Sequence, residues 1–311
     1  MQRLLLFIPV ILLFCSCAAF PTAQIGLYYG QQAEDLGALL AEIEKRNSTI
    51  ERHPAWISQA TRDFMIRNLE DISETEYSKY QQYLDDGAMY IIVHPAYYVF
   101  FHDREPIFAD ENAVDTFLNE RVYTTHMRFL QEQERSMRDF LEITSTRKRL
   151  VVLVLPGNYR DYSGFIYREL PDEFARYVNS VTNASESVLY VFSEKPNKGS
   201  LPDKANRILH RFLEEVKPNT ILVGGGYLGR CIDDFYKHLA GSVAGREVMI
   251  AGEISAFSPE DVKSLDLADY VKDGKLDLAV IQETVAAKKN RGENSLKGIL
   301  RNYRNYRNGK S

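Results

Sequence analysis

The chain has 311 residues, of which 45% are hydrophobic and 26% are charged, and its formal net charge is −5. These values are typical of a soluble globular protein with one large or two modest domains and a sizeable core. The negative net charge excludes a protein that binds nucleic acid through its overall electrostatic field, so no nucleic-acid partner is predicted.

The N-terminus has the organisation of an export signal. A basic start ending at Arg3 is followed by an apolar run from Leu4 to Phe14. This run is shorter than the ~20 apolar residues of a transmembrane helix, and it indicates a secretory signal peptide. The sequence Phe-Cys-Ser-Cys that ends at Cys17 resembles the processing site of bacterial lipoproteins. This resemblance implies a signal peptide at residues 1–16 and a lipid on Cys17.

The residues around the cleavage site also bear on localisation and on redox chemistry. Ala18 after the modified cysteine favours the outer membrane of a diderm bacterium, which predicts an envelope lipoprotein held to the membrane by its lipid anchor. Ordinary secretory cleavage after Ala23 is the alternative. With Cys17 lipidated, Cys231 keeps the free thiol and no internal disulfide can form. The sequence shows no Cys/His ligand pattern, and neither a metal nor a cofactor is predicted.

The first part of the mature chain is predicted to be helical. Residues 17–33 are expected to form a linker from the lipidated cysteine, and residues 34–86 a helical segment. Apolar residues recur at helical spacing in three stretches of that segment, 34–46, 56–72 and 76–84.

Residues 87–287 are predicted to form one α/β domain. Short apolar runs, as expected of strands buried on both faces, alternate with stretches of helical periodicity. The predicted strands are Met89–Val93, Leu150–Leu155, Val188–Phe192, Thr220–Val223, Val248–Ala251 and, as a last one, Leu276–Ile281. The predicted helices are Asn112–Ile143, Asp172–Val181, Leu201–Val216 with Ser200 as its cap, Gly229–Leu239 and Pro259–Leu265. This alternation predicts a three-layer α/β/α fold with a mostly parallel sheet of five or six strands.

The C-terminal residues 288–311 are strongly basic. They contain eight Lys or Arg and one Glu, and we expect a flexible tail. One interpretation is contact with an anionic glycan or with lipid headgroups, and the other is a solvated tail without a partner.

Polar residues follow each predicted strand. Because the carboxyl ends of parallel strands meet at one edge of a sheet, where ligands bind in α/β folds, we expect these residues to gather there. In chain order they are His94, Asn158, Arg160, Glu194, Lys195, the glycine run 224–226, Tyr227, Cys231 and Glu253.

Cys231 is the strongest candidate for chemistry at this edge. The glycine run is expected to turn the chain from a strand into a helix that carries Cys231 in its first turn, where the helix dipole lowers the pKa of a thiol. Lys195 would add electrostatic stabilisation, and His94 is the candidate base. The alternative is that Cys231, Phe235 and Leu239 form the inward face of one helix and that the cysteine only packs.

The spacing of six residues from Gly225 to Cys231, with Lys195 after the preceding strand, resembles the isochorismatase-like cysteine hydrolase family. The resemblance covers residues 89–262. It implies a parallel sheet with Cys231 as the nucleophile and Lys195 as the family's lysine. His94 stands where that family has a catalytic Asp, so the family's acid–base step is not carried over.

Two functions follow as hypotheses. The first is a cysteine-dependent, hydrolase-like or small-molecule-binding site at the sheet edge. The second is a non-catalytic envelope protein that binds a partner protein or a glycan through its basic tail and through loops rich in Tyr, of which the chain has 19.

Overall fold

The computed structural model describes residues 63–95, 137–158, 171–195, 198–243, 245–258, 261, 265, 267–272, 275–289 and 296–307. The predicted signal peptide, the linker and the helix predicted at 34–46 lie outside these ranges, as do Arg160 and most of the helix predicted at 259–265.

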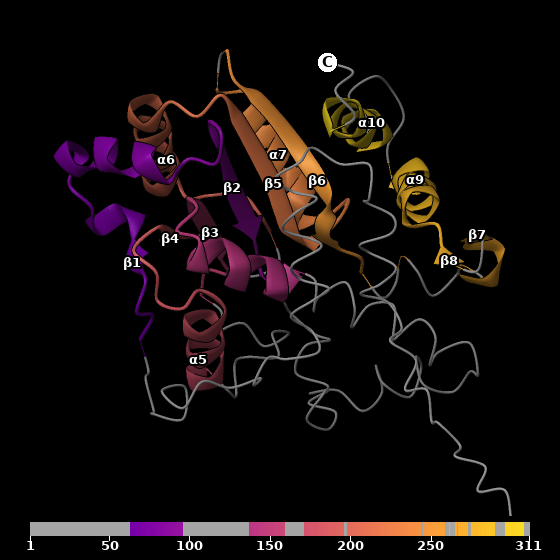
Figure 1. Cartoon of the computed structure of the whole chain (residues 1–311), viewed down its shortest axis with the longest axis horizontal. Coiled ribbons are helices and arrows are strands. Elements are labelled where there is room, and N and C mark those ends of the chain that lie inside the picture. The colour runs from indigo at the N-terminus through magenta and orange to yellow at the C-terminus, as the bar shows by residue number, and fades with distance from the viewer. Residues whose placement is uncertain are drawn as a thin grey trace, which may run out of the picture.

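The protein is built on one six-stranded parallel sheet with the order β1-β4-β3-β2-β5-β6 (Figure 1). The strands are β1 (Arg67–Asn68), β2 (Ala88–Val93), β3 (Val151–Leu155), β4 (Val188–Phe192), β5 (Thr220–Tyr227) and β6 (Glu247–Ala256). Every pairing in this sheet is parallel. The predicted α/β fold class is therefore confirmed, and the five apolar runs predicted between 89 and 251 fall in strands, except that Leu150 precedes β3.

Helices cover both faces of the sheet. They are the 3₁₀ helices η2 (Leu69–Asp71) and η3 (Glu74–Tyr83), a helical segment at residues 137–146, and α5 (Pro171–Val181), α6 (Asp203–Val216), α7 (Cys231–Ala240), α9 (Leu278–Lys289) and α10 (Leu296–Arg307). Side chains alternate between the faces, so that Met89, Ile91 and Val93 pack in one cluster with η3, α6 and α7. Tyr90 and Ile92 pack in the other with segment 137–146 and α5. This two-sided burial is why the strands have continuous apolar sequences.

The stretch 56–72 was predicted as one helix, but in its described part, residues 63–72, a short strand precedes a single 3₁₀ turn. Arg67 and Asn68 form β1, which pairs with β4, and the Asn68 side chain accepts a hydrogen bond from the N–H of Glu70 at the start of η2. Pairing with a strand that lies far away in the sequence has overridden the local helical pattern.

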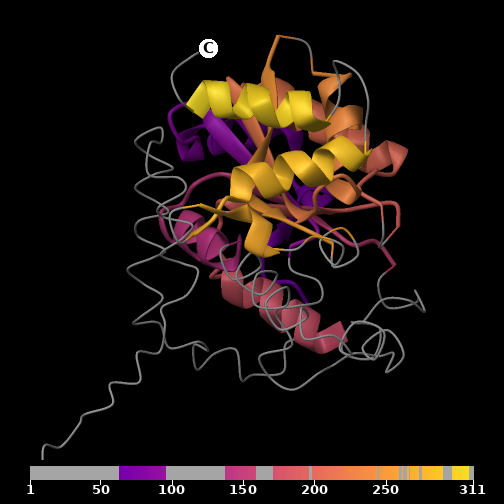
Figure 2. The ribbon, with the colours of Figure 1, turned by 90° about the vertical axis from the view of Figure 1, so that its right-hand side faces the viewer.

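The expectation of a flexible tail is wrong for residues 296–307. These residues form α10, which lies beside α9 and contacts β6 (Figures 1 and 2). Leu296, Ile299, Leu300 and Tyr303 are buried, and their spacing places them on one side of the helix. The basic residues are those on the other positions, so a high charge content concealed an amphipathic helix.

The last predicted strand, 276–281, is also wrong. A short hairpin of β7 (Val271–Lys272) and β8 (Lys275–Leu276) is followed at once by α9. The Asp277 side chain accepts a hydrogen bond from the N–H of Val280, at 3.1 Å, and thereby caps this helix. Within the described residues, no helix has the length and apolar character needed to cross a membrane.

Candidate functional site

The strand order places a topological switch point between β2 and β5. From β2 the sheet extends through β3 to β4 on one side and through β5 to β6 on the other. In open α/β sheets, ligands bind beyond the carboxyl ends of the two strands that flank such a point. Here those ends are Val93 and His94 of β2 and the glycine run of β5.

The glycine run continues β5 instead of forming the predicted turn. Gly224 pairs with Ile92 and Gly225 with Val93. Gly225 has a φ of +115°, and a Cβ there would lie 2.2 Å from the carbonyl oxygen of Val93. A Cβ on Gly226 would lie 3.0 Å from the Cys231 sulfur and 3.2 Å from the carbonyl oxygen of His94. The glycines therefore let the end of β2, the end of β5 and the thiol approach one another closely.

The other side of β5 carries an irregularity at the same edge. The register between β5 and β6 shifts between Val223 and Gly225. The Ser255 hydroxyl donates to the carbonyl of Ala251 at 2.8 Å, and Gln282 of α9 donates to the carbonyl of Gly252 at 2.9 Å. The predicted site residue Glu253 belongs to this bulged part of β6. Bulges of this kind are common next to functional sites.

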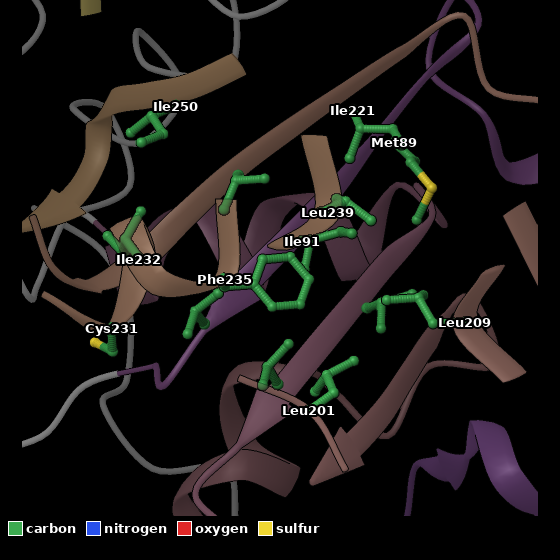
Figure 3. Close-up of a cluster of buried hydrophobic side chains, with 14 of the residues drawn as sticks. Met89, Ile91, Leu201, Leu209, Ile221, Cys231, Ile232, Phe235, Leu239 and Ile250 are labelled. Atoms are coloured by element: carbon green, nitrogen blue, oxygen red, sulfur yellow. The ribbon is translucent and has the colours of Figure 1, made fainter. Parts of the chain in front are cut away.

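Cys231 is the first residue of α7 and is 5% exposed. It belongs to the buried cluster that also contains Phe235 and Leu239, so the packing expected for this helix face is confirmed. Figure 3 shows Cys231 at the margin of the cluster, with its sulfur directed away from the Phe235 ring. The thiol thus contributes to the core while its sulfur lies at the edge of the sheet.

The electrostatic environment of this thiol differs from the one expected for a helix N-terminus. The pKa of Cys231 is raised to about 11; burial is the largest cause, and the negative charge of Asp234 acts in the same direction. The backbone N–H groups of Tyr227, Ile232 and Cys231 itself act in the opposite direction, because each favours a thiolate by hydrogen bonding. The predicted lowering of this pKa is therefore wrong for the buried thiol, since desolvation exceeds the contribution of the helix terminus.

His94 is buried directly after β2 and forms a hydrogen bond with Ser193, which directly follows β4. Its Nε2 lies 2.9 Å from the Ser193 hydroxyl. Burial lowers the pKa of His94 to about 3, so the ring is neutral at physiological pH. A base with so low a pKa accepts protons poorly at neutral pH, and this geometry does not favour the role of general base.

The other predicted residues lie around this centre. Asn158, Glu194 and Lys195 are exposed, whereas Tyr227 is half-buried. The residues after β4 pack on the start of α7, because a Cβ on Gly199 would lie 1.9 Å from the carbonyl oxygen of Cys231. The structure therefore places Gly199, four residues after Lys195, against the first residue of α7.

Two polar residues at this edge were not among the predicted site residues. Ser193, which directly follows β4, is the partner of His94. Arg230, which precedes Cys231, forms an ion pair with Asp261 at 3.3 Å. The position of Ser193, immediately after a predicted strand, could have indicated it. The ion pair of Arg230 with Asp261 could not be predicted, because it depends on the path of the chain after β6.

Among the described residues, no cluster of His, Cys, Asp and Glu side chains is suited to hold a metal ion. Comparison of the chain with models of known protein families gave no match, and neither did a search of curated proteins.

Proposed function

We propose that the protein is an exported, lipid-anchored envelope protein with a hydrolase-like small-molecule site at the β2–β5 edge of its sheet. Cys231 is its candidate nucleophile. The observation that carries the proposal is the position of the sulfur at the topological switch point, next to the N–H groups of Tyr227 and Ile232.

These groups suit attack on a carbonyl carbon. A thiol must lose its proton to act as a nucleophile, and backbone N–H groups at the start of α7 stabilise the resulting thiolate. Donors of this kind also stabilise the negative charge that develops on a carbonyl oxygen under attack. Lys195 lies on the loop whose Gly199 packs against this helix, and its proposed role is to supply a positive charge to the site.

The resemblance to isochorismatase-like cysteine hydrolases supports this proposal. In both, a lysine follows the strand before the one that leads to the cysteine, and both have a parallel sheet. His94 stands in the place of the family's catalytic Asp. It is engaged with Ser193, so any turnover would use a different proton acceptor.

The test is turnover of small ester, thioester and amide substrates by the purified protein and by Cys231→Ala. The variant is expected to lose turnover and to keep the thermal midpoint within a few degrees, because the thiol to methyl change is small. Asn302→Ala, at an exposed position on α10, controls for the effects of mutagenesis and purification on turnover. Turnover retained by Cys231→Ala would remove the nucleophile from the proposal.

The second candidate is an envelope protein that binds a glycan or a partner protein without catalysis. The observation that favours it is the burial of Cys231, which raises the pKa of the thiol to about 11 and so keeps it protonated at neutral pH. Lys297 and Arg301 are exposed one turn apart on α10 and suit an anionic ligand. Reversing both charges should abolish binding to anionic glycans or anionic lipid vesicles; unchanged binding would exclude this surface.

Anchoring is tested separately at the N-terminus. If Cys17 carries lipid, the mass of the N-terminal peptide will include acyl chains, and Cys17→Ala will move the protein from the membrane fraction to the soluble one. An unmodified N-terminus that begins after Ala23 would instead support ordinary secretion.

A further inference from the structure

We propose that His94 and Ser193 form a positioning unit that holds the Lys195 loop, of which residues 193–195 and 198–200 are described, against the helix that carries Cys231. The inference rests on the proposed function for its meaning, but the contacts that carry it are independent of catalysis.

The Ser193 hydroxyl joins the ends of three neighbouring strands. It accepts a hydrogen bond from the N–H of Gly157 after β3, at 3.1 Å, and donates one to the carbonyl of Lys195, at 2.8 Å. A hydroxyl has one proton to donate and two lone pairs. Because its proton is used by Lys195, the contact with His94 must be a donation from the Nε2–H of the ring. All three bonding positions of this hydroxyl are thus occupied, and the tautomer of His94 is fixed.

The same hydroxyl begins the closure of the loop. The carbonyl of Lys195, which accepts from Ser193, also accepts from the N–H of Lys198 at 3.2 Å. The N–H of Glu194 donates to the carbonyl of Ser200 at 2.7 Å, and the Ser200 hydroxyl donates back to the Glu194 carboxylate at 3.2 Å. Ser200, predicted as the cap of α6, serves this loop instead, and the N-terminal residue of that helix follows Pro202.

The loop packs against the start of α7 through Gly199 and against Gly157, which follows β3, through Ser193. A Cβ on Gly199 would lie 1.9 Å from the carbonyl oxygen of Cys231, and a Cβ on Gly157 would lie 1.8 Å from that of Ser193. At both contacts the backbone approaches more closely than any side chain allows. A displacement of the loop therefore changes the surroundings of the thiol.

The backbone of His94 agrees with a positioning role. Its φ of +50° is uncommon for a residue other than glycine, and its N–H donates to the carbonyl of Val154 at 2.8 Å. A buried side chain in this conformation is held by its surroundings. In this conformation the ring reaches past β3 to Ser193, which directly follows β4.

The decisive variants are His94→Gln and His94→Asn in the full chain. A glutamine amide can donate from about the position of Nε2, whereas the shorter asparagine adopts the same backbone conformation but does not reach Ser193. Ser193→Ala removes the acceptor itself. Hydrogen exchange of residues 194, 195 and 198–200 and the rate of iodoacetamide alkylation at Cys231 are measured for each variant.

We expect exchange in this loop to become about tenfold faster in His94→Asn and Ser193→Ala, and to stay within about twofold of the original in His94→Gln. Alkylation of Cys231 should rise in the first two variants and not in the third. Imidazole ¹⁵N signals from the original protein should show that Nε2 carries the proton and Nδ1 does not at neutral pH.

The proposal is overturned if loop exchange is unchanged in His94→Asn while the protein stays folded, or if the Nδ1–H tautomer is observed. If His94→Asn unfolds, Ser193→Ala and the tautomer still decide the matter. Failure of the proposed function has a different signature: Cys231 then shows no turnover in any variant, while loop exchange still follows the hydrogen bond. If His94 were a catalytic base, Gln and Asn would abolish turnover equally.

Discussion

The replacement of Gly225 by Ala tests the close approach of β5 to β2 at the switch point. The new Cβ would lie 2.2 Å from the carbonyl oxygen and 2.6 Å from the nitrogen of Val93, in a strand that is buried on both faces. The φ of +115° adds backbone strain. Strain of this kind costs about 1–3 kcal/mol, and overpacking in a core costs a further ~1–3 kcal/mol.

We therefore expect Gly225→Ala to lower the free energy of unfolding by about 2–6 kcal/mol. For a protein of this size that corresponds to a fall in Tm of at least about 4 °C. Thermal unfolding followed by circular dichroism and urea unfolding followed by fluorescence measure the two quantities. Gly241→Ala is the matched control, since a Cβ there meets no atom closer than 3.4 Å and φ is −71°. Equal stability of the two variants would refute the close packing of β2 on β5.

Three further predictions concern pH and the C-terminal helix. The folded-state pKa of His94 is lowered to about 3, so the unfolded chain binds a proton at this residue first as pH falls. Stability that is present above pH 6.5 is therefore lost towards pH 3, by up to roughly 5 kcal/mol. Urea titrations across this range should show that His94→Gln removes that loss. The folded-state pKa of Cys231 is raised to about 11, so the thiol of the unfolded chain ionises first as pH rises. The free energy of unfolding should therefore fall by roughly 3 kcal/mol between pH 9 and 11. An equal fall in Cys231→Ala would contradict this prediction. Leu300→Ala, at a residue 2% exposed, should destabilise by about 2–5 kcal/mol while the exposed Asn302→Ala changes stability by less than ~0.5 kcal/mol; equal effects would mean that α10 is not docked.

The strands were predictable because strands buried on both faces appear in the sequence as continuous apolar runs. The run 188–192 coincides with β4, since a strand covered on both faces needs apolar residues at every position. Its parallel direction followed from the alternation with helices such as α6. The order of the strands did not follow, because local sequence contains no information on which strand pairs with which.

The elements that were predicted wrongly depend on distant contacts. Gly224 to Gly226 have the composition of a turn, and it is the approach of Val93 that keeps them in β5. The 296–307 segment was judged by its charge, although Leu296, Leu300 and Tyr303 carry the helical spacing that docks it.

At the candidate site, the sequence indicated which residues lie at the edge but not how they interact. The position of Cys231 at the start of a helix was predictable from the preceding strand and glycines. The raised pKa of the thiol was not, because it reflects burial by several elements at once. The pairing of His94 with Ser193 requires β3 to lie between their strands, and it became visible only with the strand order.

The most direct test of a functional thiol is the alkylation rate of Cys231 in the folded protein. The chain has three cysteines, so the modified Cys231 peptide is quantified by mass after reaction with iodoacetamide at neutral pH. A matched buried control is Val178→Cys in a chain with Cys231→Ala, because Val178 is 0% exposed in the core and close to cysteine in size.

The account predicts that Cys231 reacts at least about tenfold faster than the control cysteine, because its sulfur lies at the sheet edge beside the N–H groups of Tyr227 and Ile232 and needs only local opening. Equal rates, both set by global unfolding, would contradict the account and make Cys231 a packing residue of the core.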